Sequence, residues 1–480
     1  MRRKLAVALI TIFLFSAIGS TIYASAPYRG YTYTEQWGGT ASPNAYLPLK
    51  VIYPGLDSPS DFMIRNDYIY IADTGNNRIV VLDSSFEFVR EIYSYINEDG
   101  QEMTFSSPEG LFVNTDHDIY IADTENNQIV VLNTNGELIR IIGEPRSDIL
   151  PADFRYFPTR VAVSRAGRIY VIGRGIFHGI IEFDPDGNFS RFMGTNRVSF
   201  NPLDYLWRRF ATEEQRRRMA VFLPTSFNSL EIDDIGFIFT TVTEEGSDNP
   251  VQRLNPGGID VIRFPQGTTI HPVGDLSFVS MGAQGVTFSG TSIFVDVTVN
   301  EYGMYAVLDS KRGRVFVYSA DSQLLYIFGK YGIQEGTFRV PIGISWFGED
   351  ILVLDRGNNS ITVFTPTEYG NFINNAIKNH IIGNDDLTTY YWNRVLQLNT
   401  NYALAHVGIG RSLYRQGYYR EAMEYFMRGN NRFYYSRAFA NFRREFLRDN
   451  LGYVLTGIVI LCVGLVALNI RKRAKHGIAE

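Results

Sequence analysis

The sequence predicts a mainly β protein: a six-bladed β-propeller followed by a small α-helical segment and one transmembrane helix. Three observations lead to this fold class. A strand-turn-strand phrase recurs along the chain, as IYIADTGNNRIVVLD at residues 69–83 and as IYIADTENNQIVVLN at residues 119–133. The residues after the last repeat change to a helical pattern, and a long apolar run lies near the carboxyl terminus.

The repeat sets the number of units. Asp73 and Asp123 occupy the same place in the two clearest copies and lie 50 residues apart, a spacing typical of stacked supersecondary units. Each copy predicts a β-hairpin, because β-branched and aromatic runs flank an Asn-rich turn. Weaker copies at residues 168–184, 237–255, 303–319 and 350–365 bring the number of units to six.

Further strands complete each unit. Most hairpins are followed by a third strand, as in FEFVREI, ELIRIIG, NFSRFMG and QLLYIFG, and four are preceded by a proline-marked strand, SPSDFMI, SPEGLFV, FPTRVAV and VPIGISW. Four short antiparallel strands per unit, repeated six times, are typical of a six-bladed propeller.

The string of proline, IYIAD, an Asn-Asn turn and an apolar strand closely resembles the NHL repeat. The resemblance covers residues 31–365 and is strongest in units one, two and six. Units three and four depart from it, with Gly173 in place of the hairpin aspartate and no Asn-Asn turn. The resemblance implies a six-bladed, TolB-like propeller that serves as a recognition scaffold.

The hairpin acids are expected to be structural. Asp73 can accept hydrogen bonds from turn amides and lies within reach of Arg78, which would close the hairpin electrostatically. The same structural role is assigned to the matching residues of the other units, namely Asp123, Asp309, Arg314 and Asp355.

Ring closure requires one more strand. The sixth unit continues from ITVFT directly into a helical pattern, so it lacks an outer strand of its own. An open sheet edge invites aggregation, and TYTEQWG at residues 32–38 has the pattern of a strand. We therefore expect residues 32–38 to pair onto the last blade.

The amino terminus predicts export. MRRK followed by LAVALITIFLFSAIG has the charged head and apolar middle of a signal peptide, which is placed at residues 1–26. Pro27 directly follows the candidate cleavage site at Ala26 and disfavours cleavage there. An uncleaved signal anchor is therefore the alternative.

The carboxyl terminus predicts a membrane anchor. Residues 451–470 form an apolar run about as long as a membrane span requires. The basic residues 471–480 follow and are expected to be cytoplasmic, with the propeller extracytoplasmic and the chain a single-pass protein of the cell membrane. The only cysteine, Cys462, lies inside the predicted span, so no disulfide can form within the chain.

Two helical regions accompany the ring. Residues 366–449 predict a stalk whose central part, residues 385–430, resembles a tetratricopeptide helix pair packed on flanking helices or on a partner. An insertion at about residues 201–220 reads as an arginine-rich amphipathic helix. The expected role of that helix is packing against the ring, with partner docking as the alternative.

The candidate ligand site lies at the mouth of the central channel. Alignment of the units on the hairpin acid places one residue of each blade there: Asp61, Gly110, Arg160, Ser226, Asp296 and Gly343. Of these, Asp61, Arg160, Ser226 and Asp296 are the predicted ligand-binding residues. They would hold a small polar or cationic ligand, or form a rim salt bridge; calcium is the alternative occupant because it favours oxygen ligands.

No cofactor, metal or catalytic residue is assigned, and the expectation is that the protein is not an enzyme. The runner-up is a metal-dependent lactonase of the gluconolactonase type, or a lyase, as found among six-bladed relatives. His178 and His271 are the only histidines of the ring that such a site would use, and no Ser-His-Asp order or HExxH motif is present.

The expected partner is a protein or a small polar or carbohydrate ligand, with a neighbouring membrane transporter as a further hypothesis. A formal net charge of −5 argues against nucleic acid, which requires a basic surface. Aromatic residues make up 14% of the chain and would suit sugar stacking, although propeller cores also use them heavily.

Overall fold

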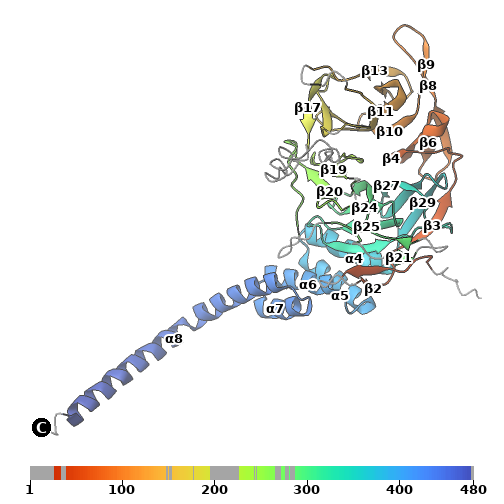
Figure 1. Ribbon diagram of the computed structural model, residues 1–480. Helices are drawn as coiled ribbons and strands as arrows, with labels where there is room; N and C mark the ends of the chain where they lie inside the picture. Colours follow the sequence, from red (N-terminus) through yellow and green to blue (C-terminus); the bar gives the residue numbers. More distant parts are fainter. Residues whose placement is uncertain are drawn as a thin grey trace, which may run out of the picture.

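The computed structural model describes residues 26–33, 39–147, 150, 154–176, 178–194, 226–242, 244, 246–264, 272–275, 280–281 and 287–476. These residues form six β-sheets arranged in a ring, with helices against one side of it (Figure 1). The inner strands of successive blades contact one another around the ring, so the six-bladed prediction is confirmed.

The first three blades each contain four antiparallel strands in chain order. Blade one comprises β4 (Asp61–Arg65), β5 (Tyr68–Asp73), β6 (Arg78–Asp83) and β7 (Phe88–Ile92). Blade two comprises β10 (Pro108–Val113), β11 (Ile119–Asp123), β12 (Gln128–Leu132) and β13 (Leu138–Ile142). Blade three comprises β14 (Pro158–Val163), β15 (Ile169–Gly173), β16 (Ile180–Phe183) and β17 (Phe189–Met193).

The other three blades differ in how they are completed. Blade four has three strands in the described part of the chain, β18 (Glu231–Ile232), β19 (Ile238–Thr241) and β20 (Val251–Leu254). Blade five comprises β23 (Phe294–Val299), β24 (Tyr305–Asp309), β25 (Arg314–Tyr318) and β26 (Leu324–Phe328). Blade six comprises β27 (Pro341–Phe347), β28 (Asp350–Asp355) and β29 (Ser360–Pro366), with β3 (Tyr46–Ile52) as its outer strand.

The amino-terminal part of the chain closes the ring, but not with the expected residues. The closing strand is β3, in which Tyr46 pairs with Pro366 and Ile52 with Ile361. The predicted segment 32–38 is wrong for this role: β1 (Tyr31–Tyr33) pairs instead with β2 (Gly39–Ala41). In YLPLKVI of β3, polar and apolar residues alternate less clearly than in TYTEQWG, and Pro48 argues against a strand. The strand tolerates this proline because it lies at the edge of its sheet.

Within the described residues, three two-stranded ribbons lie outside the blades. Besides β1 and β2, they are formed by β8 (Ser94–Ile96) with β9 (Glu102–Thr104), and by β21 (Ser280–Met281) with β22 (Thr287–Phe288).

The core lies between neighbouring sheets. Each large cluster of buried side chains draws on two adjacent blades, as when Ile121 of blade two packs with Val81 of blade one. The alternation of each strand explains this arrangement, since a sheet with neighbours on both faces buries both sets of side chains.

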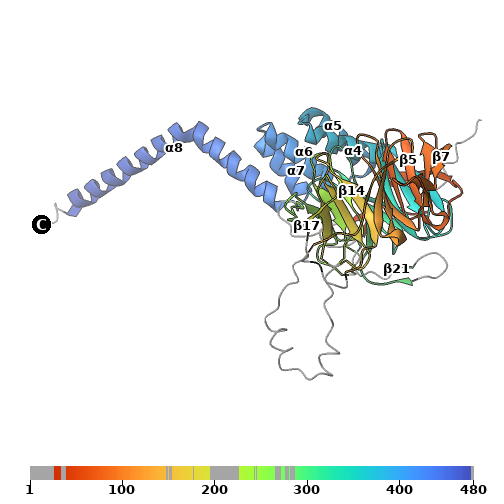
Figure 2. The same cartoon turned by 90° about the horizontal axis from the view of Figure 1, so that it is seen from above.

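Five helices follow the ring in the described part of the chain, each packed against the next. They are α4 (Glu368–Ile381), α5 (Asp385–Leu398), α6 (Ala403–Arg415), α7 (Tyr419–Arg428) and α8 (Arg432–His476). Figure 2 shows α4 to α7 as a compact group beside the ring and α8 extending away from it. The predicted helical segment is present, whereas its tetratricopeptide character stays a prediction.

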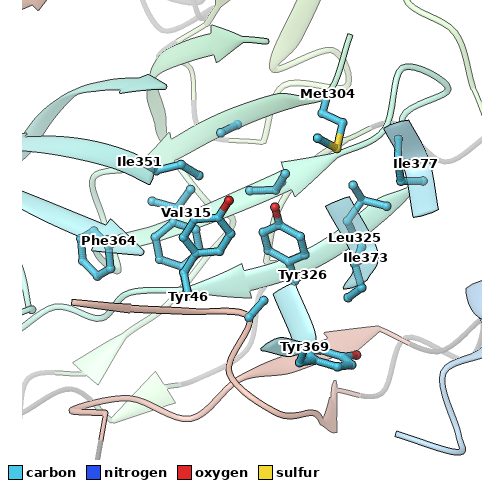
Figure 3. Close-up of a cluster of buried hydrophobic side chains, with 14 of the residues drawn as sticks. Tyr46, Met304, Val315, Leu325, Tyr326, Ile351, Phe364, Tyr369, Ile373 and Ile377 are labelled. Carbon is cyan, nitrogen blue, oxygen red and sulfur yellow. The ribbon is translucent and has the colours of Figure 1, made fainter. Parts of the chain in front are cut away.

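The helices share a core with blades five and six. Tyr369 and Ile373 of α4 pack with Met304, Val315 and Ile351 of these blades (Figure 3). Two hydrogen bonds also join the helical segment to these blades.

The Tyr402 hydroxyl donates to the Leu325 carbonyl of blade five at 2.6 Å, and the Tyr326 hydroxyl donates to Asn374 of α4 at 2.7 Å. The helical segment is therefore an extension of the propeller core and not a loosely attached arm.

No single helix among the described residues is both long and apolar enough to cross a membrane. The two parts of α8, Arg432–Tyr453 and Leu455–Arg471, meet the criteria of length and composition only as a pair, joined with a bend of 51°. The predicted span 451–470 falls on this bend and on the second part. The predicted signal at residues 1–26 and the insertion at residues 201–220 lie outside the described residues, except for Ala26.

Candidate functional site

The hairpin aspartates connect loops to turns. The Asp73 carboxylate accepts from the Asp57 amide at 2.7 Å, from Asn76 Nδ2 at 2.9 Å and from Arg78 Nε at 2.7 Å. Asp73 is buried, so these bonds replace the water that its charge has lost. Each such aspartate ties the loop before the inner strand to the turn after the second strand.

The same geometry recurs at the matching positions. Asp123 accepts from the Ser106 amide, and Asp355 accepts from the Val340 and Gly357 amides. These side chains point into turns and not into the channel.

Blade five differs from the expected hairpin pairing. Arg314 forms its ion pair with Asp275 and not with Asp309, and it also donates to the Tyr31 hydroxyl. Arg312 is the arginine near Asp309, at 4.0 Å. Asp275 lies in the loop before blade five, far from Asp309 in sequence, so the hairpin pattern gave no signal of it.

Three of the four predicted ligand-binding residues lie together at one end of the channel. Arg160 Nε lies 4.0 Å from Asp61 Oδ2, and the charges of Asp61 and Arg160 both influence Asp296. A rim salt bridge between Asp61 and Arg160 is therefore present.

These side chains also join neighbouring inner strands. Asp61 accepts from the Leu111 amide of blade two at 3.1 Å, and Asp296 accepts from the Ile344 amide of blade six at 2.8 Å. Arg160 donates to the Ser60 and Glu109 carbonyls of blades one and two. The cluster thus links the inner strands of five blades, one, two, three, five and six.

Ser226 is not the blade-four member of this ring. In the other blades, the residue at the channel mouth lies two positions after the residue that pairs with the hairpin aspartate or its equivalent. In blade five, for example, Phe294 pairs with Asp309, and Asp296 is the residue at the channel mouth. In blade four Phe227 pairs with Val242, which makes Ser229 the equivalent residue. The irregular fourth repeat shifted the alignment by three residues.

A cavity of about 830 Å³ opens at the other end of the channel. Its wall is formed by residues from the middle of the inner strands to their carboxyl ends and by the loops that follow. The inner strands contribute Met63, Arg65, Phe112, Glu231, Thr298 and Ser345. Asp61, Arg160 and Asp296 do not line it, so the predicted mouth and the cavity are at opposite ends.

Glu231 is the residue that the sequence alone did not reveal. It lies two positions beyond Ser229, and alternation along a strand places both on the channel side. Correct alignment of blade four would have placed Glu231 next to the channel axis, level with Met63 of blade one.

Burial raises the pKa of the three channel carboxyls. The pKa of Glu231 rises to about 8, first because of its burial and then because of the negative charge of Asp296. The pKa of Asp296 rises to about 7 for the same first reason, with Asp61 adding to it and Arg160 opposing it. Burial also raises the pKa of Asp61, against the charge of Arg160. The channel thus has two groups that can change charge near neutral pH.

Within the described residues, no group of three or more His, Cys, Asp or Glu side chains is placed to hold a metal ion. His178 packs against Phe192, with ring centroids 5.2 Å apart, and is not part of the cavity wall. His271 lies outside the described residues.

Comparison with known proteins agrees with the repeat. Residues 105–132, which include β10 to β12, match the family described as NHL repeat. A comparison with curated proteins finds no significant match.

Among solved structures, virginiamycin B lyase from Staphylococcus aureus has 11% identity and a TM-score of 0.41, covering 66% of this chain and 98% of that chain. A streptogramin B lyase has 12% identity and a TM-score of 0.40, covering 68% of this chain and 100% of that chain. These similarities assign no activity to this chain.

Proposed function

We propose that this protein is a membrane-tethered, extracytoplasmic binding scaffold that takes a small polar ligand into the channel of its propeller. The cavity of about 830 Å³ is the observation that carries the proposal. Its size suits a small molecule. Its wall is largely polar and charged and also contains aromatic and apolar side chains, which suits a polar ligand with an apolar part. Phe112, Tyr120, Tyr170 and Trp346 supply the aromatic part of the wall.

The tether rests on α8. The large apolar side chains of residues 455–470 are more than half exposed, including Leu461, Val463 and Ile470. Such a surface is unfavourable in water and favourable in lipid hydrocarbon. The signal-like amino terminus supports export of the propeller, and a neighbouring membrane transporter is the class of partner that a tethered binding protein would serve.

The test is to identify what the full-length protein carries. The detergent-solubilised chain, purified under mild conditions, is analysed by mass spectrometry for small molecules, metals and proteins. The proposal expects a small molecule in near-stoichiometric amount that is lost when Thr298→Trp fills the cavity. A protein that binds no small molecule and only a partner on its outer surface would contradict the channel proposal.

A further inference from the structure

Glu231 is the only charged residue at its level of the channel. The equivalent positions on the other inner strands are Met63, Phe112, Ala162, Thr298 and Ser345. Glu231 pairs through its backbone with Phe239 of β19, which fixes its place on the strand. It lines the cavity.

The other channel carboxylates are already committed. Asp61 accepts from the Phe62 and Leu111 amides, and Asp296 accepts from the Val297 and Ile344 amides. The Glu231 carboxyl group forms no hydrogen bond or ion pair with any group in the described part of the chain. It is therefore available to a molecule in the cavity.

The charges around Glu231 come from three blades. Asp296 on β23, Asp61 on β4 and Asp233 directly after β18 all disfavour its ionisation, whereas Arg65 on β4 favours it. Arg65 forms no ion pair with Glu231, and its Nε donates to the Val113 carbonyl at 3.1 Å. Ionised Glu231 thus has more negative than positive charge around it.

We propose that the channel cavity binds an organic cation, a protonated amine on a small apolar body, with the ammonium group placed against Glu231. This inference rests on the proposed function of the channel. A positive nitrogen supplies the counter-charge that Glu231 lacks and can donate hydrogen bonds to it. Met63, Phe112 and Trp346 provide apolar wall for the rest of the molecule. A bare metal ion would need several converging ligands, and the described residues offer no such group.

Binding is then linked to a proton. At pH values below its pKa of about 8, the Glu231 carboxyl of the ligand-free protein is mostly protonated, whereas an ammonium group beside it favours the ionised form. Binding of the cation at pH 7 therefore releases up to about one proton. A neutral or anionic ligand in the same cavity has no such effect.

Three probes of similar shape test the charge preference: benzylammonium, benzyl alcohol and phenylacetate. Each is titrated into the detergent-solubilised full chain at pH 7 by calorimetry, in two buffers that differ in ionisation enthalpy. The expected result is that benzylammonium binds at least about tenfold more tightly than benzyl alcohol and releases a proton, and that phenylacetate does not bind. Glu231→Gln should remove both the preference and the proton release.

Glu301→Gln is the matched control, because Glu301 also lines the cavity but lies exposed at its rim. It should leave the affinity for benzylammonium and the proton release unchanged. Glutamine has the shape of the protonated glutamate, so Glu231→Gln should fold, and its melting curve checks this.

The outcomes separate the two proposals. Binding of benzyl alcohol or phenylacetate as tight as that of benzylammonium, or binding unaffected by Glu231→Gln, overturns the cation inference and leaves the channel as a ligand site. Failure of all three probes overturns the inference as well. The binding-scaffold proposal is overturned as well only if the purified protein carries no small molecule whose binding is lost in Thr298→Trp.

Discussion

At the scale of single residues, the channel acids should make stability depend on pH. The pKa of Glu231 is about 8 in the folded chain, against about 4.3 in an unfolded one. Between these values the folded state holds a proton that the unfolded state has lost. Glu231 therefore costs stability as pH rises, by up to about 1.4 kcal/mol per pH unit, and the whole cost is present above pH 8.

Glu231→Gln should relieve this cost. We expect the variant to melt at nearly the same temperature as the parent at pH 4 and at a higher temperature at pH 8, measured on the full chain in detergent. Glu301→Gln should show no such divergence. A variant that is less stable than the parent at pH 8 would mean that ionised Glu231 is stabilised by contacts in the folded protein.

The hairpin aspartates, in contrast to Glu231, should increase the stability of the fold. Asp355→Ala leaves the Arg339, Val340 and Gly357 amides without their acceptor. We expect a loss of about 2 to 4 kcal/mol, since buried donors without partners are costly. Thermal unfolding measures it, with exposed Glu98→Ala as the control. A shift no larger than that of the control would show that water replaces the carboxylate.

At the scale of elements, β3 should be essential for closing the ring. A chain that begins at Tyr53 lacks β3 and exposes the edge of β29, whereas a chain that begins at Pro43 lacks only β1 and β2. The first should aggregate or melt markedly lower, and the second should remain monomeric in size-exclusion chromatography with a smaller loss of stability. Equal behaviour of the two chains would assign the closing role to another segment.

The helix packing offers a second test at this scale. A Cβ atom at Gly408 of α6 would overlap the indole nitrogen of Trp392 on α5. Gly408→Ala should therefore loosen the α5–α6 contact and speed amide hydrogen exchange in both helices, while blades one to three stay protected. Gly452→Ala, where the added carbon meets nothing within 4 Å, is the control. Unchanged exchange at α5 would mean that Trp392 moves aside without cost.

The elements also show how far the sequence could be interpreted. Blades with a regular phrase, such as IYIAD and its turn, were predictable because local strand and turn preferences coincide with the buried faces of the sheets. The choice of YLPLKVI over TYTEQWG as the closing strand was not predictable, since both sequences have the pattern of a short edge strand and only the long-range pairing with β29 identifies YLPLKVI. The cavity was missed for a related reason: blade four has lost its turn signals, and a shift of three residues concealed Glu231.

At the scale of the whole molecule, the proposed orientation in a membrane can be tested at the two ends of the chain. If the propeller is extracytoplasmic, protease added to cells stripped of their wall should digest it and leave an epitope fused after Glu480 intact. Permeabilised cells are the control and should lose both. Protection of the propeller with loss of the epitope would reverse the orientation and remove export from the proposed function.

The shared core of the ring and the helices bears on how binding could be transmitted. Blades five and six contribute Thr298 and Ser345 to the cavity wall and also pack against α4. A ligand that changes the spacing of these inner strands would therefore act on sheets that are continuous with the helices and, through them, with α8. Amide exchange of α4 with and without benzylammonium would measure this coupling.

Closure by β3 also determines when the propeller can complete its folding during synthesis. The residues of β3 are synthesised before those of any blade, but their partner β29 is the last strand of the propeller to be made. Until then the nascent chain carries an unpaired strand at its start, while the growing stack of sheets keeps an exposed edge. Such edges are prone to mispairing between chains, so the yield of folded protein in the cell should depend on how quickly translation reaches residue 366. The propeller therefore cannot close until β29 of blade six has been synthesised and has paired with β3.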